Sequence, residues 1–388
     1  MKVYDSASIR NVAIVGHSGA GKTQLAAAML FTSGMANRLG KVDDGTTITD
    51  FDDEEIARKH TLSSSLAYAE WNKKKINLID TPGIANFFSD ARAALSICDG
   101  ALVVVDAVAG VEVQTEKVWT SADNLGIPCL VVLNRMDRDR ASLDRSLLSL
   151  RDVFGRTVVP VQIPIGEDKA FRGVVDLVSM QALTFLTDGS GTLTVGAVPA
   201  DLAEGAHAAR DALIELVAEA DETLMERFFD AGTLTQAELE AGLRSASLTR
   251  RVFPLLCTSA LLNVGVQPLL DALLAYAPSP LERSIKAIDR ASGEPATYDE
   301  SESAPAAAFV WKTIADPFAG RLTLFRVASG TLKSDTTIYN LIRETSERLG
   351  HLALLQGKTQ TSLPEIKAGD LGVVAKLRET QTGDTLAG

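Results

Sequence analysis

Residues 16–23 read Gly16-His17-Ser18-Gly19-Ala20-Gly21-Lys22-Thr23, between a short apolar run and a helix-like stretch. This is the pattern of a phosphate-binding loop, whose glycines let backbone N–H groups turn toward phosphates. We expect Lys22 to reach the β- and γ-phosphates and the Thr23 hydroxyl to coordinate Mg²⁺. A loop that follows a strand and opens a helix suits this chemistry, because anions bind at helix N-termini. The motif predicts that all eight residues bind a nucleotide.

Three further polar segments each follow an apolar run. In Asp80-Thr81-Pro82-Gly83, the aspartate can hold Mg²⁺ through a water and the Gly83 N–H can sense a γ-phosphate. In Asn134-Arg135-Met136-Asp137, the last carboxylate can accept two hydrogen bonds from guanine, and adenine offers no such donor pair. In Thr258-Ser259-Ala260, small residues would let backbone N–H groups reach the guanine carbonyl. Each segment alone also suits an ordinary strand end, but their order along the chain predicts GTP rather than ATP.

Apolar runs alternate with helix-like stretches over most of the first 282 residues. The runs are short and rich in Val, Ile and Leu, which fits strands buried on both faces. They cover residues 11–15, 76–80, 101–106, 129–133 and 252–256, and the helix-like stretches cover residues 22–31, 88–97, 113–125, 142–153 and 266–276. This alternation predicts an α/β P-loop domain with a mostly parallel sheet.

The alternation is interrupted between about residues 157 and 251, which we interpret as an α+β insertion. Its predicted strands cover residues 158–163, 173–178 and 181–186, and its predicted helices cover residues 203–220 and 235–245. The second helix opens with a capping box of Thr235 and Glu238. Residues 165–250 carry 6 basic and 15 acidic residues, a net charge of −9. The insertion is therefore either a docking surface for a basic protein or a merely solvated surface.

The pattern changes again toward the C-terminal end. Residues 283–305 are rich in Ser, Glu, Ala and Pro and predict a linker. Residues 306–388 show short apolar runs separated by Gly-containing turns, which is typical of a small antiparallel β-barrel. This part carries a net charge of +2. We therefore predict a GTP-binding domain over residues 1–282 and a barrel domain over residues 306–388.

Composition and charge exclude several classes of protein. Of the 388 residues, 46% are hydrophobic and 23% charged, which excludes a disordered chain or a coiled coil. A net charge of −12 argues against a general binder of nucleic acid or anionic membranes. The sequence shows no apolar run of roughly 18 residues and no signal-peptide pattern. Cys98, Cys129 and Cys257 lie in apolar stretches, so we expect buried thiols in a reducing, cytoplasmic compartment.

These motifs resemble the translational GTPases, and among them those of the elongation factor G type. The resemblance covers nearly the whole chain. It rests on the phosphate loop and on INLIDTPG, CDGALVVVDAVAGVEVQTEKVW, VVLNRMDR, LLCTSALLNVGVQPLLDALLAYAPSP, AFVWKTIADPFAGRLTLFRVASGTL and AGDLGVVAKLRETQTGDTLAG. Because members of this family continue into further domains, it also implies that the chain is either a fragment of a longer protein or a truncated paralogue.

The resemblance implies a GTPase that acts on the ribosome, in translocation or a related step, with GTP or GDP and Mg²⁺ bound. It implies contact with ribosomal RNA through the barrel and with a ribosomal stalk protein through the acidic insertion. It further implies a monomer that does not bind membranes. A GTPase unrelated to ribosomes is disfavoured, because the barrel and the insertion both match a ribosomal factor.

The resemblance also singles out Thr61, which precedes Asp80 by the 19 residues typical of a Mg²⁺-binding switch threonine. The chain departs from the family at three positions: it has Gly19 in place of an aspartate, Arg135 in place of a lysine, and Ile84 in place of a histidine. An arginine can still stack over a base. Isoleucine, in contrast, cannot orient the attacking water as the family's histidine does.

The family has isoleucine directly before the switch threonine and histidine directly after the segment that corresponds to Asp80–Gly83. In this chain the two residue types have changed places, because His60 precedes Thr61 and Ile84 follows Gly83. Either His60 partly replaces the missing histidine and acts with Lys22 and Gly83 in catalysis, or it is a solvated loop residue and turnover is slow. The first alternative describes a ribosome-stimulated hydrolase. The second describes a GTP/GDP switch that docks on the ribosome as a protection or regulatory factor.

Overall fold

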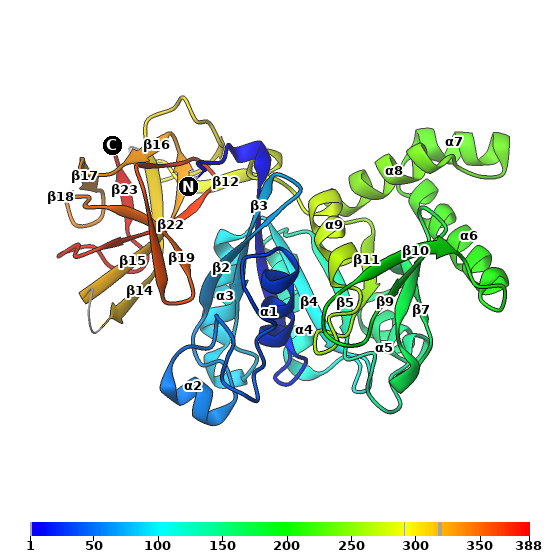
Figure 1. Cartoon of the computed structure of the whole chain (residues 1–388). Coiled ribbons are helices and arrows are strands. Elements are labelled where there is room, and N and C mark those ends of the chain that lie inside the picture. The colour runs from blue at the N-terminus through cyan, green and yellow to red at the C-terminus, as the bar shows by residue number, and fades with distance from the viewer. Residues whose placement is uncertain (1, 291, 317–319) are drawn as a thin grey trace. The chain divides into compact units, whose positions relative to one another are not determined.

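The computed structural model describes residues 2–290, 292–316 and 320–388 (Figure 1). Its largest α/β sheet has the strand order β2-β3-β1-β4-β5-β11-β6. The pairs β1–β4, β4–β5, β5–β11 and β11–β6 are all parallel. The prediction of a mostly parallel sheet is therefore confirmed. The strands are β1 Ile9–Gly16, β2 Ser65–Trp71, β3 Lys74–Asp80, β4 Gly100–Asp106, β5 Cys129–Asn134, β6 Val158–Pro160 and β11 Phe253–Cys257.

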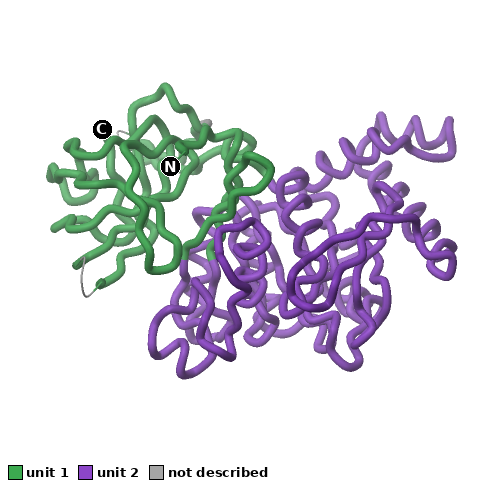
Figure 2. The backbone as a smooth tube through the Cα atoms, in the orientation of Figure 1, with its two compact units in different colours: residues 1–11, 66–79, 278–388 green, residues 12–65, 80–277 purple. Residues whose placement is uncertain are grey.

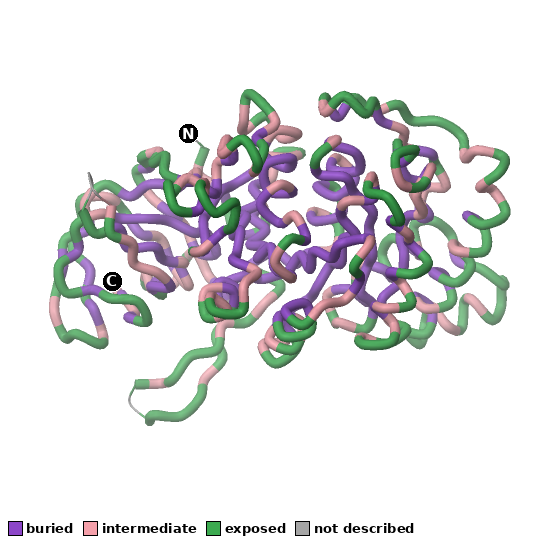
Figure 3. The backbone as a smooth tube through the Cα atoms, turned by 90° about the horizontal axis from the view of Figure 1, so that it is seen from below, coloured by how far each residue is buried: buried purple, intermediate pink, exposed green. Residues whose placement is uncertain are grey.

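Helices connect the strands of this sheet. They are α1 Lys22–Thr32, α2 Asp53–Arg58, α3 Phe88–Ile97, α4 Val113–Asn124, α5 Leu143–Phe154 and α9 Val266–Tyr276. Every residue of β1, β4, β5 and β11 is buried, and Figure 3 shows buried backbone in the interior. Burial on both faces explains why these strands are apolar without alternation. Their carboxyl ends all reach one edge of the sheet, where the polar segments follow.

The insertion forms its own antiparallel sheet, with the strand order β10-β9-β8-β7. Its elements are β7 Gln162–Ile165, β8 Gly173–Asp176, β9 Gln181–Phe185, β10 Leu193–Ala197, α6 Ala203–Glu219, α7 Glu222–Ala231 and α8 Gln236–Leu248. The predicted capping box of Thr235 and Glu238 is confirmed at the start of α8. Helix α7, which the sequence analysis did not identify, contains no buried residue.

The single strand predicted over residues 158–163 is wrong. The structure has two strands here, β6 in the main sheet and β7 in the sheet of the insertion. The chain passes from one sheet to the other at Val161, whose N–H donates to Leu255 O while its carbonyl accepts from Leu177 N. Strand β6 is fully buried, and β7 is buried at Gln162 and Ile165, so the apolar pattern continues across a change of sheet.

The C-terminal part is antiparallel, as predicted. Its eight-stranded sheet has the order β18-β17-β23-β14-β15-β22-β19-β20, and β16 pairs with β21. The strands are β14 Ala307–Asp316, β15 Gly320–Ser329, β16 Thr331–Lys333, β17 Thr337–Asn340, β18 Thr345–Arg348, β19 Leu352–Gln356, β20 Thr359–Leu363, β21 Glu365–Lys367, β22 Leu371–Ala375 and β23 Thr385–Ala387. Within the predicted linker, β12 Ser284–Ile288 and β13 Pro295–Asp299 form a hairpin. The domain boundaries given above stay predictions.

The chain divides into two compact units (Figure 2). One contains residues 12–65 and 80–277, and the other residues 1–11, 66–79 and 278–388. In the second of these units, Lys75 Nζ lies 2.7 Å from Asp370 Oδ1, and both side chains are buried. Asn77 also donates to this carboxylate, so the buried charge has a cation and a hydrogen-bond donor. Among the described residues, no helix is long and apolar enough to cross a membrane.

Candidate functional site

The phosphate loop lies between β1 and α1, and two of its glycines pack against neighbouring strand ends. A Cβ on Gly16 would lie 2.3 Å from Val104 O, and one on Gly21 would lie 2.5 Å from Asn134 Nδ2. Gly21 also has a left-handed backbone, with φ of 88°. Only glycine fits both the conformation and the close approach. The loop is thereby held against β4 and β5.

Lys22 extends back over the loop from the first turn of α1. Its Nζ donates to Gly16 O at 3.1 Å and to His17 O at 2.8 Å. Burial lowers the pKa of Lys22 to about 8, although the carboxylates of Asp80 and Asp50 favour its charged form. Burial removes hydration from the Lys22 ammonium. A phosphate beside it would supply a negative charge that stabilises the charged form.

Two buried carboxylates and three hydroxyls gather beside Lys22. The Thr23 and Thr61 hydroxyls are 2.8 Å apart, and Thr61 Oγ1 donates to Asp50 Oδ1 at 2.8 Å. Thr49 Oγ1 donates to Asp80 Oδ2 at 2.8 Å. Burial, followed by the charge of Asp80, raises the pKa of Asp50 to about 7, and burial raises the pKa of Asp80 to about 6. Both carboxylates therefore ionise less readily than in water, and a bound cation would favour their charged forms.

These oxygen atoms fit a magnesium ion. Asp80 Oδ1 is buried and has no hydrogen-bond partner among the described residues. Mg²⁺ takes oxygen ligands, commonly one or two carboxylates together with waters and substrate phosphates. Within the described part of the chain, no group of three or more His, Cys, Asp or Glu side chains could hold a metal ion. Bound Mg²⁺ would thus need the threonine hydroxyls and the nucleotide as well.

The residues predicted to recognise guanine converge at the ends of β5 and β11. Asn134 Nδ2 donates to Ala20 O at 3.0 Å, and Asn134 Oδ1 accepts from the Ala260 N–H at 3.0 Å. Asn134 therefore ties the phosphate loop to the segment after β11. Asp137 Oδ1 is buried and has no hydrogen-bond partner among the described residues. A buried carboxylate oxygen without a partner is able to accept a hydrogen bond from the paired N–H donors of guanine.

These segments enclose one cavity of about 280 Å³. Most of the predicted site residues line it, namely Ser18, Gly19, Gly21, Lys22, Thr23, His60, Thr61, Gly83, Asn134, Arg135, Asp137 and Ala260. Asp50, which the sequence analysis missed, lines it too. Asp50 lies in an irregular segment without periodicity, and nothing in the sequence marks its contact with Thr61.

The remaining predicted residues, Gly16, His17, Ala20, Asp80 and Ser259, do not line the cavity. His17 instead contacts the start of α4. Its Nδ1 accepts from the Gln114 N–H at 3.3 Å, and its Nε2 lies 3.4 Å from Glu112 Oε1. The His17 side chain therefore ties the phosphate loop to α4.

His60 and Ile84 both line the cavity. His60 follows Lys59, which ends α2 in a left-handed conformation with φ of 57°. The His60 side chain is exposed, and its N–H donates to Glu55 O at 3.2 Å. Ile84 directly follows Gly83, where a Cβ would lie 2.3 Å from Lys22 Nζ. The loops before Thr61 and after Asp80 thus meet the same cavity.

Comparison with known proteins gives matches along almost the whole chain. The family model of the Elongation factor Tu GTP binding domain matches residues 7–279, and that of Elongation factor G domain 2 matches residues 305–388. A crystal structure of a protein from Thermus thermophilus is similar, with 31% sequence identity and a TM-score of 0.86. That match covers 98% of this chain and 54% of the other, so the chain spans about half the length of that protein.

Proposed function

The chain belongs to the translational GTPases of the elongation factor G type, and from this premise we propose that it hydrolyses GTP on the ribosome in translocation or a related step. The observation that carries the proposal is the cavity, which is lined by the phosphate loop, by Thr61, by Gly83 and by residues of the Asn134–Asp137 motif. Membership of the family implies guanine-nucleotide binding. We propose in addition that the chain acts on the ribosome and that the ribosome stimulates its turnover of GTP.

Lys22, Thr23, Thr61 and Asp80 would hold the phosphates and a Mg²⁺ ion. Bound Mg²⁺ would supply charge neutralisation at the β- and γ-phosphates. Lys22 would add a second positive charge on the same oxygens, and the Gly83 N–H would hold a γ-phosphate oxygen. The Thr61 hydroxyl is shared between Thr23 and Asp50, which joins the segment around Thr61 to residues that would lie beside the phosphates and Mg²⁺. This sharing supports a switch role for the segment around Thr61.

His60 is the group that we propose to orient the attacking water. Two observations support this role. His60 lines the cavity, and Ile84, which stands where the family has a histidine, has no titratable side chain. A positioned proton-transfer group contributes roughly 10²–10⁴-fold to a rate. Ile84 would then screen the γ-phosphate, the part played by the family's isoleucine. Hydrolysis would proceed by in-line attack of water on the γ-phosphate.

Ile84 also favours a second candidate function. If His60 does not reach the water, the chain would be a GTP/GDP switch that docks on the ribosome with little turnover. Both functions need guanine specificity, which calorimetry with GTP and ATP tests. ATP binding as tight as GTP binding would overturn both. Turnover with and without ribosomes separates them, because only the hydrolase is stimulated.

The acidic insertion is the surface that we propose to meet a basic ribosomal protein of the stalk. Helix α6 carries Glu204, Asp211 and Glu215, which are all exposed. The neighbouring α7 has no buried residue, and Phe229 is 77% exposed. An apolar side chain flanked by acidic groups suits a partner that is both basic and partly apolar. The charge of −9 over residues 165–250 would speed the encounter.

Ribosomal RNA is the partner that we propose for the barrel. Residues 306–388 carry a net charge of +2 in a chain of net charge −12. Lys333, Lys358 and Arg378 are exposed on this domain. Exposed cations bind phosphate backbones and make the affinity depend on salt. Replacing these three residues by alanine should weaken binding of the chain to ribosomes and reduce its dependence on salt, because fewer phosphate contacts would form.

A further inference from the structure

Asp106 ends β4 beside the nucleotide cavity, and both oxygens of its carboxylate are engaged. Oδ1 accepts from the N–H groups of Val108 at 2.8 Å and Ala109 at 3.2 Å. Oδ2 lies 3.1 Å from Arg135 Nη1, and the aspartate side chain is only 8% exposed. Because the turn after β4 fixes one oxygen, the other is held in one place. The carboxylate is therefore a rigid anchor for the arginine.

The sheet places Arg135 next to this anchor. Asp106 and Asn134 are register partners of β4 and β5, and the Ala107 N–H donates to Asn134 O at 3.0 Å. Arg135 then adopts a left-handed backbone with φ of 66°, and the next N–H, of Met136, donates to Thr258 O at 3.1 Å. The backbone of Arg135 is fixed on both sides, and its long side chain is restrained by Asp106.

The Arg135 side chain lines the cavity between the guanine motif and the phosphate loop. A Cβ on Gly21 would lie 3.4 Å from Arg135 Nε, so the side chain approaches the loop backbone. A second cation, Arg138, has its Nη1 3.6 Å from Asp106 Oδ2 and is more exposed than Arg135, at 52% against 29%. Both arginines line the cavity, but Arg135 is the closer one and donates a hydrogen bond to Asp106 Oδ2 at 3.1 Å.

We propose that Asp106 is a positioning residue that holds Arg135 as a wall of the guanine site and thereby sets how slowly guanine nucleotide leaves. The inference rests on the proposed function, since it concerns the same site. A planar guanidinium can stack on an aromatic ring, and its fork can bind a carboxylate at the same time. A released arginine would sample other rotamers and expose the base to water. Asp106 itself does not line the cavity.

The test is a double-mutant cycle on the dissociation of a fluorescent GDP analogue. Asp106→Asn keeps an oxygen acceptor for Val108 and Ala109 but removes the charge that holds Arg135. We expect it to speed dissociation about tenfold while the association rate changes less than about twofold, since affinity changes within one site fall mainly on dissociation. Arg135→Ala should have a similar effect. In the Arg135→Ala background, Asp106→Asn should add much less than it does in wild type, because the closer of the two arginines is already absent and only Arg138 remains.

A merely structural aspartate would behave differently. Its replacement would speed dissociation equally with and without Arg135, and such additivity would overturn the proposal. Glu219→Gln is the matched control, because it removes the partner of Arg156, a pair that does not line the cavity. It should dissociate GDP as wild type does. If Asp106→Asn does not fold, Arg135→Ala carries the test, and an unchanged dissociation rate rejects the proposal. Wild type that binds no GDP would refute the proposed function instead.

Discussion

At the residue scale, single side chains of the candidate site have hydrogen-bonding capacity that the described residues do not satisfy. Asp137 Oδ1 and Asp80 Oδ1 are both buried and lack partners among the described residues. A buried acceptor without a donor costs about 1–3 kcal/mol. A ligand that brings donors or a cation to these oxygens would recover that cost. Guanine would bring N–H donors to Asp137 Oδ1, and Mg²⁺ would bring a positive charge to Asp80 Oδ1.

We predict that Asp137→Asn weakens GTP binding by about 1–3 kcal/mol, because one acceptor would then face two donors of guanine. The same change should relax discrimination toward xanthine nucleotides, whose base offers an acceptor in place of the amine. Titration calorimetry with GTP and with xanthosine triphosphate measures both effects. Equal GTP affinity in wild type and variant would remove Asp137 from the guanine site.

His60→Ala should lower ribosome-stimulated GTP turnover by at least about tenfold, since a positioned proton-transfer group is worth roughly 10²–10⁴-fold. GTP affinity should stay nearly unchanged, because His60 does not belong to the phosphate or guanine motifs. The measurement is steady-state phosphate release with saturating ribosomes. If wild type and variant turn over GTP equally, His60 is a solvated loop residue and the slow switch is the better account.

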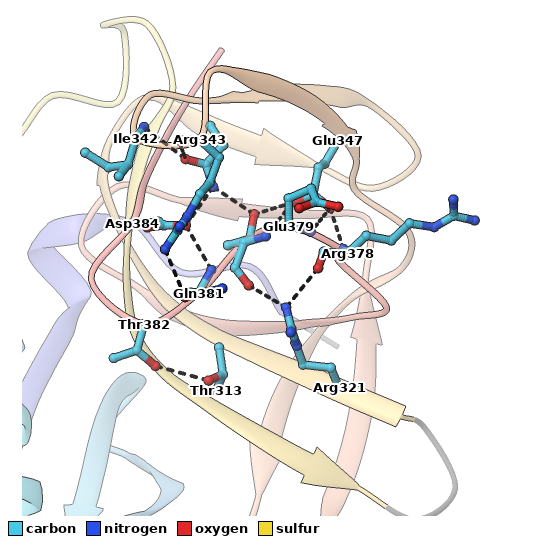
Figure 4. Close-up of polar contacts among 12 residues, drawn as sticks. Thr313, Arg321, Ile342, Arg343, Glu347, Arg378, Glu379, Gln381, Thr382 and Asp384 are labelled. Atoms are coloured by element: carbon cyan, nitrogen blue, oxygen red, sulfur yellow. Dashed lines mark hydrogen bonds and ion pairs between the residues drawn. The ribbon is translucent and has the colours of Figure 1, made fainter.

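At the element scale, the carboxylate of Glu347 in β18 holds the segment before β23 (Figure 4). It accepts hydrogen bonds from the N–H groups of Arg378, Glu379 and Thr380 and from the Thr380 hydroxyl. Burial raises the pKa of Glu347, but these hydrogen bonds outweigh it, so the pKa lies below its usual value. A lowered pKa in the folded state means that the ionised carboxylate stabilises the barrel.

This stabilisation should be present above about pH 4.5 and should disappear as the pH falls through the lowered pKa. We therefore predict that Glu347→Gln lowers the free energy of unfolding by about 2–3 kcal/mol at pH 7, where bonds to a charged acceptor are lost. The difference should shrink as the pH falls below about 4.5 and through the lowered pKa of Glu347. Urea unfolding at a series of pH values checks this. A difference that is independent of pH would show that the charge of Glu347 does not matter.

The sequence predicts elements well where one period governs the whole segment. Helices over residues 88–97 and 266–276 occur at those residues, because an apolar face repeats through each. It fails at Val161, where two buried strands of different sheets adjoin. It also missed α7, whose apolar side chains cover no core. The site motifs were predictable because each lies at a strand end, whereas Asp50 reaches the cavity only through the tertiary fold.

At the scale of the whole molecule, charge is distributed unevenly between insertion and barrel. We predict that the triple variant Glu204→Gln, Asp211→Asn, Glu215→Gln slows association with ribosomes about three- to tenfold at low salt, because it weakens the attractive field. The difference should vanish at high salt. A matched triple of exposed residues outside the insertion, Glu116→Gln, Asp144→Asn and Asp152→Asn, is the control. Association rates that the α6 variant leaves unchanged would identify the insertion as a solvated surface.

We propose that the cavity binds GTP and that the chain hydrolyses it on the ribosome. The most direct test of this proposal is GTP turnover by the chain with and without saturating ribosomes, with ATP measured in parallel. We expect GTP hydrolysis that ribosomes raise at least about tenfold, through positioning of the catalytic groups, and no comparable hydrolysis of ATP. GTP turnover that ribosomes leave unchanged would contradict the proposal that the chain is a ribosome-stimulated GTPase.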